Sequence, residues 1–274
     1  MHTQVIGIVA IILYLSAAFV IGARLFAAAE SPVRSRRPGL ALGWAALLCH
    51  ALVLQQVLLT PEGLNLGFFN AASLVAGLTV LLLLLAAVPA PVENLGIVLF
   101  PAAALSIALM FAYPVRDVPS ASTNWKIDLH IALSLAAYSL LALAALQALV
   151  LAWQDHQLRN RRPTRLIRRL PPLQTMETLL FQLLAGGFFL LTIALITGFV
   201  FLENIFAQHL VHKTTLSIIA WCLLAVLLWG RWRFGWRGRK AVRLTIAAFL
   251  LLMLAYFGSK FVLELVLGTT GSTP

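Results

Sequence analysis

The sequence predicts an all-α, polytopic integral membrane protein with about eight transmembrane helices. Of its 274 residues, 61% are hydrophobic and only 11% are charged. The apolar residues occur in blocks of about 20, the length that crosses a hydrocarbon core of about 30 Å. Backbone groups in lipid must be hydrogen-bonded within the chain, and these blocks are too long for barrel strands, so we expect helices.

Eight apolar blocks define the predicted helices. They cover residues 3–24, 40–59, 66–88, 95–113, 128–153, 179–202, 212–230 and 242–263. No basic residue precedes the first block, which is also too long for the apolar core of a signal peptide, so we interpret it as a retained span. We expect residues 1–274 to form a single transmembrane domain.

The basic residues predict the orientation in the membrane. With the N-terminus outside, 16 of the 20 Lys and Arg residues fall on the inner side and 4 on the outer side. Because inner loops carry the excess of positive charge, both termini are predicted to be extracytoplasmic in a bacterial cytoplasmic membrane. The net charge of +11 then indicates contact with anionic inner-leaflet lipid. Nucleic-acid binding is excluded, because the Arg clusters lie in short loops against the membrane.

The segment NWKIDLHIALSLAAY, residues 124–138, carries the first candidate site residue. His130 lies within about one turn of the start of a membrane helix, and an ionisable side chain there indicates a functional site. His209 and His212 lie three residues apart at the start of the seventh predicted helix. His50 lies about 10 residues from the outer end of its helix, which corresponds to a depth of about 15 Å.

Two imidazoles at matched depth on neighbouring helices could hold one metal ion. Bis-histidine ligation of haem iron fits His130 together with His209 or His212, because it needs two neutral nitrogens and an apolar slot for the macrocycle. His50 is too deep to share that iron and would belong to a second site or to a relay step.

Other interpretations of these residues remain open. Zinc would need three or four ligands, and Asp128 is the one further candidate ligand near His130. A proton or ion path would need polar residues across the bilayer, and the candidates are His50, Gln55, Gln56 and Gln147. A structural role for His130, bonded to a backbone carbonyl or to Asp128, is equally compatible with the pattern.

The sequence contains no nucleophile–base pair, Gly-rich phosphate loop or paired carboxylate set, so we do not expect an enzyme. Cys49 and Cys222 lie inside predicted helices without a CxxC or CxxCH motif. A disulfide framework and covalent haem attachment are therefore not expected.

Two segments resemble the cytochrome c assembly family of membrane proteins (CcsA/CcmC type), and within it the YpjD/HemX-like branch. They are NWKIDLHIALSLAAYSLLALAALQALVLA and HKTTLSIIAWCLLAVLLWGRWRFGWRGRKA, with LAYFGS later in the chain. Known members bind haem b and present it at the outer face for cytochrome c maturation. The resemblance implies that His130 is a haem ligand, and that haem and cytochrome c biogenesis proteins are partners.

The chain departs from the family pattern in the loop before the seventh helix. Fully equipped members carry a Trp-rich loop there, whereas this chain has FAQHLVHKTT without a Trp, and the second outer histidine expected after the last helix is absent. We therefore expect a haem-handling accessory, with His130 and His212 as the axial pair, and not a full haem lyase. The alternatives are a transporter or regulatory subunit that kept the fold without haem, and an assembly scaffold.

Overall fold

Eight long apolar helices make up most of the structure. The computed structural model describes residues 2–26, 35–60, 63–114, 125–160, 170–201, 211–258 and 260–261. Within these ranges, eight helices are long and apolar enough to cross a membrane. The predicted all-α, eight-helix class is confirmed. The sidedness of the termini stays a prediction.

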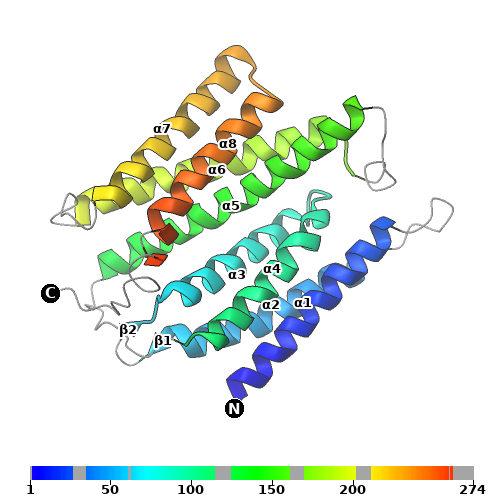
Figure 1. Ribbon diagram of the computed structural model, residues 1–274, viewed down its shortest axis with the longest axis vertical. Helices are drawn as coiled ribbons and strands as arrows, with labels where there is room; N and C mark the ends of the chain where they lie inside the picture. Colours follow the sequence, from blue (N-terminus) through cyan, green and yellow to red (C-terminus); the bar gives the residue numbers. More distant parts are fainter. Residues whose placement is uncertain are drawn as a thin grey trace. The chain divides into compact units, whose positions relative to one another are not determined.

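The chain divides into two compact units, and α1 to α4 form the first. These helices are α1 (His2–Phe26), α2 (Arg37–Leu58), α3 (Phe68–Ala86) and α4 (Gly96–Ala112). In this unit α1 packs against α2 and α4, and α3 packs against the same two helices (Figure 1). Small residues allow close approach: a Cβ on Gly43 would lie 2.8 Å from the Phe100 ring.

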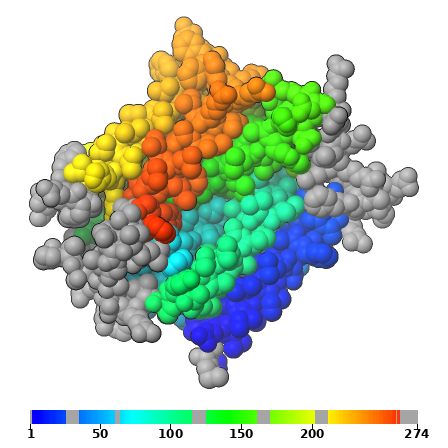
Figure 2. Space-filling view, viewed as in Figure 1, coloured from blue at the N-terminus to red at the C-terminus, as the bar shows by residue number. Residues whose placement is uncertain are grey.

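The outward surface of the first unit is apolar, as expected for contact with lipid. On α1 the exposed residues Val5, Ile8, Ile12, Leu15 and Phe19 recur every three or four positions, and Phe19 is 75% exposed. Figure 2 shows α1 (blue) and α4 (green) side by side at the surface. A helix that turns this stripe outward is stable where its surroundings are themselves apolar.

Short connections close the first unit. Strands β1 (Leu59–Thr60) and β2 (Gly63–Leu64) pair antiparallel after α2, and the 3₁₀ helix η1 (Glu93–Leu95) precedes α4. Glu93 is 3% exposed, and its carboxylate lies 2.7 Å from Arg24 and 3.6 Å from Arg36. These two ion pairs join the end of α1 and the start of α2 to the turn before α4.

The second unit contains α5 (Trp125–Arg159), α6 (Leu173–Phe201), α7 (Val211–Phe234) and α8 (Arg239–Met253). A π-helix, η3 (Leu254–Gly258), continues α8. Helix α6 packs against α5 and α7, and α8 packs against the same two helices (Figure 1). The division into two units leaves the single-domain expectation a prediction.

Several helices extend beyond their apolar blocks. Helix α5 continues six residues past the predicted end at residue 153, and α6 begins at Leu173 instead of 179. The block marks the extent of the hydrocarbon, whereas polar turns continue a helix where side chains support them. Arg159 pairs with Asp155 at 3.0 Å, and Gln154 donates to the Pro171 carbonyl at 2.9 Å.

The turn between α7 and α8 is held by specific contacts. Gly235 and Gly238 adopt positive φ angles of 64° and 59°, which glycine accepts without strain. The Trp236 ring lies on Gly230, where a Cβ would collide with it. The Gly238 N–H donates to Glu177 of α6 at 3.1 Å, which ties the start of α8 to the neighbouring helix.

Candidate functional site

His130 lies in the second turn of α5 and is half-buried against α6. Its Nδ1 lies 3.1 Å from the Thr197 Oγ1. Gly198, the next residue on α6, makes room for the ring, because a Cβ there would lie 3.0 Å from the His130 Cε1. The imidazole is therefore seated in a small recess on α6, with one nitrogen held by a hydroxyl.

The contacts of Thr197 bear on the tautomer of His130. The Thr197 hydroxyl has one proton, and its Oγ1 lies 3.0 Å from the Ala194 carbonyl oxygen and 3.1 Å from Nδ1 of His130. With the hydroxyl proton on the carbonyl, Thr197 accepts from His130, so that Nδ1 carries the ring proton and Nε2 carries the lone pair. Metal-binding histidines show this arrangement, in which a partner on one nitrogen orients the other towards the metal.

His212 lies in the first turn of α7, and its side chain is exposed. Helices α5 and α7 both begin at the end of the second unit where α6 ends (Figure 1). Both helices also pack against α6. The common end agrees with the predicted matched depth, while the axial pairing of His130 and His212 stays a prediction. His209 lies outside the described residues.

Aromatic side chains surround α5 near its His130 end. Trp125 and Phe201 lie with ring centroids 6.3 Å apart. Two turns beyond His130, the buried Tyr138 ring contacts Phe249 of α8 and Phe257 of η3 at 5.6 and 5.5 Å. The Tyr138 hydroxyl is buried, and no described residue forms a hydrogen bond with it. This end of the unit is therefore rich in aromatic side chains that pack against one another.

His50 occupies a different environment, in the core of the first unit. It is 0% exposed, its Nδ1 lies 3.2 Å from the Tyr14 hydroxyl, and its Nε2 lies 2.9 Å from the Ser73 hydroxyl. The Ser106 Oγ lies 2.8 Å from the Ala103 carbonyl of its own helix and 3.4 Å from the Ser73 Oγ. The four helices α1 to α4 each contribute one residue to this polar cluster.

Both nitrogens of His50 are occupied in this cluster. A neutral imidazole has one donor and one acceptor nitrogen, and hydroxyls satisfy both. No lone pair is left for a metal, so of the two predicted roles for His50 the geometry favours a relay step over a second haem site. Of the other candidates for an ion path, Gln55 and Gln56 are exposed, and Gln147, which belongs to the second unit, bonds to the Met176 carbonyl at 3.0 Å.

The sequence interpretation concentrated on histidines and missed the hydroxyls that hold them, namely Thr197, Tyr14 and Ser73. The available signal was a Ser, Thr or Tyr inside a largely apolar helix, at a depth matching a histidine on a neighbouring helix. Within the described ranges there is no group of three or more His, Cys, Asp or Glu residues that could hold a metal. A zinc site built from several protein ligands therefore has no support in this part of the chain.

Comparison with known proteins identifies the family. Residues 39–267 match the family described as "Cytochrome C assembly protein", a region that includes all the candidate histidines. The chain belongs to this family. It is 36% identical over 237 residues to the inner membrane protein YpjD of Escherichia coli K12, covering 84% of this chain and 88% of that protein.

More distant relatives cover smaller parts of the chain. The cytochrome c biogenesis protein CcsA of Gloeobacter violaceus is 29% identical over 100 residues, which are 36% of this chain and 30% of that protein. Protein HemX of Brevibacillus brevis is 24% identical over 147 residues, which are 53% of this chain and 54% of that protein. No solved structure matches the chain.

Family membership and the eight helices identify a multi-pass protein of the bacterial inner membrane. Membership also supports a role in cytochrome c assembly. The predicted family resemblance and localisation are confirmed.

Proposed function

We propose that this protein binds haem b at His130 and handles haem as an accessory in cytochrome c assembly. The observation that carries the proposal is the recess on α6, where the Thr197 hydroxyl lies 3.1 Å from Nδ1 of His130 and Gly198 makes room for the ring. In the proposed tautomer Nδ1 carries the proton and Nε2 is the ligand atom. The family supplies the chemical context, since its members are named for cytochrome c assembly and biogenesis.

The described residues fit the requirements of a haem ligand. His130 is a neutral imidazole in a partly apolar environment, its orientation is restricted by Thr197, and Gly198 admits its ring. His212 would supply the second neutral nitrogen from the start of α7. Bound haem would bring an iron able to carry one electron, while the protein's part is to bind it, orient it and exclude water.

The accessory role follows from the segment before α7. The family resemblance implies that a full haem lyase presents haem on a Trp-rich loop, and FAQHLVHKTT contains no Trp. We propose that this protein holds or passes on haem without the covalent attachment step. It would act together with cytochrome c biogenesis proteins and would not be an enzyme.

The test is spectroscopic. The full chain is expressed with a haem precursor, purified in detergent, and its reduced-minus-oxidised spectrum is recorded. We expect a bis-histidine b-type spectrum that His130→Ala abolishes and His212→Ala weakens or shifts to a different ligation state. His156→Ala is the matched control, because His156 is an exposed histidine at the other end of α5 that bonds to Asn160. Absence of any haem spectrum in the unsubstituted protein would refute haem binding.

A phenotype separates this proposal from a non-haem transporter or regulatory subunit. If haem handling is the function, the His130→Ala, His212→Ala double variant loses both the pigment and the cytochrome c maturation phenotype. A non-haem subunit would keep its phenotype unchanged in this variant.

A further inference from the structure

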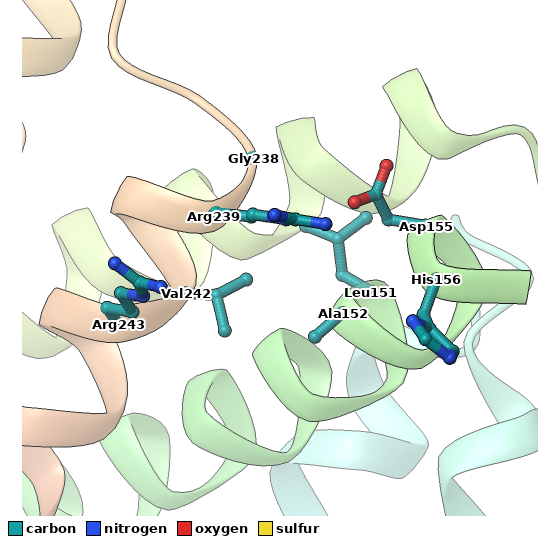
Figure 3. Close-up of a pocket in the computed structure, with 8 residues that line it drawn as sticks. All are labelled: Leu151, Ala152, Asp155, His156, Gly238, Arg239, Val242 and Arg243. Carbon is teal, nitrogen blue, oxygen red and sulfur yellow. The ribbon is translucent and has the colours of Figure 1, made fainter. Parts of the chain in front are cut away.

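A pocket of about 250 Å³ lies between α5 and the start of α8, at the end of the second unit that the positive charges predict to be the inner one (Figure 3). Leu151 and Ala152 of α5 and Val242 of α8 form its apolar part. Arg239 and Arg243 of α8 line its opposite side, and Asp155 and His156 lie at its edge on α5. The pocket therefore combines an apolar surface with two guanidinium groups.

The charges around this pocket favour an anion. Arg239 and Arg243 are one helical turn apart, both are exposed, and neither forms an ion pair with a residue of the described ranges. Figure 3 shows the Arg239 side chain extending from α8 towards α5. The acidic residue of the pocket, Asp155, is already paired with Arg159 at 3.0 Å. The pocket is therefore lined by two arginines and by one carboxylate that has its own partner.

The position of the pocket along the helices matches the membrane boundary. Leu151 and Ala152 belong to the last turn of the apolar block that ends at residue 153, and Asp155 and His156 follow it. On α8, Arg239 precedes the apolar block and Val242 begins it. Trp153, beside the pocket on α5, is a residue type that prefers the lipid–water interface. The arginines therefore lie at the level where lipid phosphates occur.

The pocket wall on α8 is preorganised. Gly238, at its start, donates its N–H to Glu177 at 3.1 Å, and Arg231 lies 3.7 Å from the same carboxylate. These bonds place the first turn of α8, and with it Arg239, before any ligand arrives. A ligand then meets a fixed wall instead of a loop that must first be ordered, which lowers the entropic cost of binding.

We infer that this pocket binds the headgroup of an anionic glycerophospholipid of the inner leaflet. Arg239 and Arg243 contact the phosphate, and Leu151, Ala152 and Val242 contact the glycerol and the first acyl carbons. Basic pockets between membrane helices on the cytoplasmic side bind acidic headgroups in this way. Free inorganic phosphate would leave the apolar part without a partner. The site is a defined one, in addition to the general attraction of the Arg-rich loops, and it does not depend on haem binding.

The full chain is purified, stripped of lipid and returned to nanodiscs of defined lipid composition. Native mass spectrometry then measures which lipid the protein retains. Phosphatidylglycerol is the probe and phosphatidylcholine the neutral comparison. We expect the R239Q/R243Q variant to bind phosphatidylglycerol about 10- to 30-fold more weakly, because each cation near the surface contributes about one power of ten or less. The matched control is R233Q/R237Q, which removes the same charge from two exposed arginines outside the pocket, one at the end of α7 and one between α7 and α8.

A second variant tests the apolar part without changing charge. Ala152→Phe fills the pocket, and we expect it to weaken phosphatidylglycerol retention while thermal unfolding in detergent remains close to that of the unsubstituted protein. If this variant is misfolded, the comparison of R239Q/R243Q with R233Q/R237Q still tests whether the pocket binds the lipid. Equal weakening by both arginine pairs would overturn the inference in favour of diffuse charge attraction. Unchanged retention in R239Q/R243Q, or displacement of the lipid by millimolar inorganic phosphate, would also overturn it.

Discussion

Two buried tyrosines allow the hydrogen-bonded cluster around His50 to be tested by one matched comparison. The Tyr14 hydroxyl bonds to His50 at 3.2 Å, whereas the Tyr138 hydroxyl is buried without a partner in the part of the chain that the structure describes. Tyr14→Phe keeps the ring and leaves a nitrogen of the fully buried His50 unsatisfied. Tyr138→Phe keeps the ring and removes a hydroxyl that had no bond to lose. Both substitutions remove a buried phenolic hydroxyl, but the hydroxyl of Tyr14 has a hydrogen-bond partner and that of Tyr138 has none among the described residues.

The expected magnitudes follow from the cost of an unmade bond. Stranding a buried donor or acceptor costs about 1–3 kcal/mol in soluble proteins, and interhelical bonds in membranes are worth about 0.6 kcal/mol on average and at most about 1.7. We therefore expect Tyr14→Phe to lower the free energy of unfolding by about 0.5–2 kcal/mol. Tyr138→Phe should leave it unchanged or raise it, because burying an unbonded hydroxyl is itself unfavourable.

The assay is reversible unfolding of the purified protein in mixed micelles by added denaturing detergent, followed by circular dichroism. A double variant with His50→Phe serves as the control. Once the imidazole is gone, Tyr14→Phe should lose most of its effect. The reasoning is refuted if Tyr138→Phe destabilises as much as Tyr14→Phe, or if the effect of Tyr14→Phe persists in the His50→Phe background.

Two further predictions concern the recesses that hold the histidines. Thr197→Val removes the hydroxyl that contacts His130, and we expect the affinity for haem to fall about 10- to 100-fold, as it does when the partner of a metal-binding histidine is removed. Titration of the purified apoprotein with haemin measures this affinity. An unaltered affinity would contradict the proposed role of Thr197. Gly77→Ala places a Cβ 3.2 Å from the His50 Cε1, whereas Gly22→Ala meets nothing within 4 Å. We expect Gly77→Ala to destabilise by about 1–3 kcal/mol and Gly22→Ala to be neutral or stabilising in the same unfolding assay, and equal effects would show that the His50 recess is not tight.

The helices were predictable because lipid imposes a strict rule on sequence. A backbone that crosses a hydrocarbon core must be helical and apolar for about 20 residues, so the eight blocks could be counted directly. The ends were less predictable, because polar turns beyond the lipid obey local contacts. Asp155 with Arg159 extends α5, and no apolar pattern records such a pair. The position of each histidine along its membrane helix could likewise be predicted from the sequence.

The partners of those histidines depend on how the helices rotate about their axes. In an apolar helix every face has a similar hydropathy, so periodicity does not indicate which face meets which neighbour. Tertiary packing places Thr197 against His130, and Tyr14 and Ser73 against His50, over separations of 23 to 67 residues. The chain alone thus specified eight spans and the family to which they belong. Packing decided which hydroxyls each imidazole meets, one at His130 and two at His50, because a hydrogen bond requires two groups within about 3 Å and sequence spacing does not encode that distance.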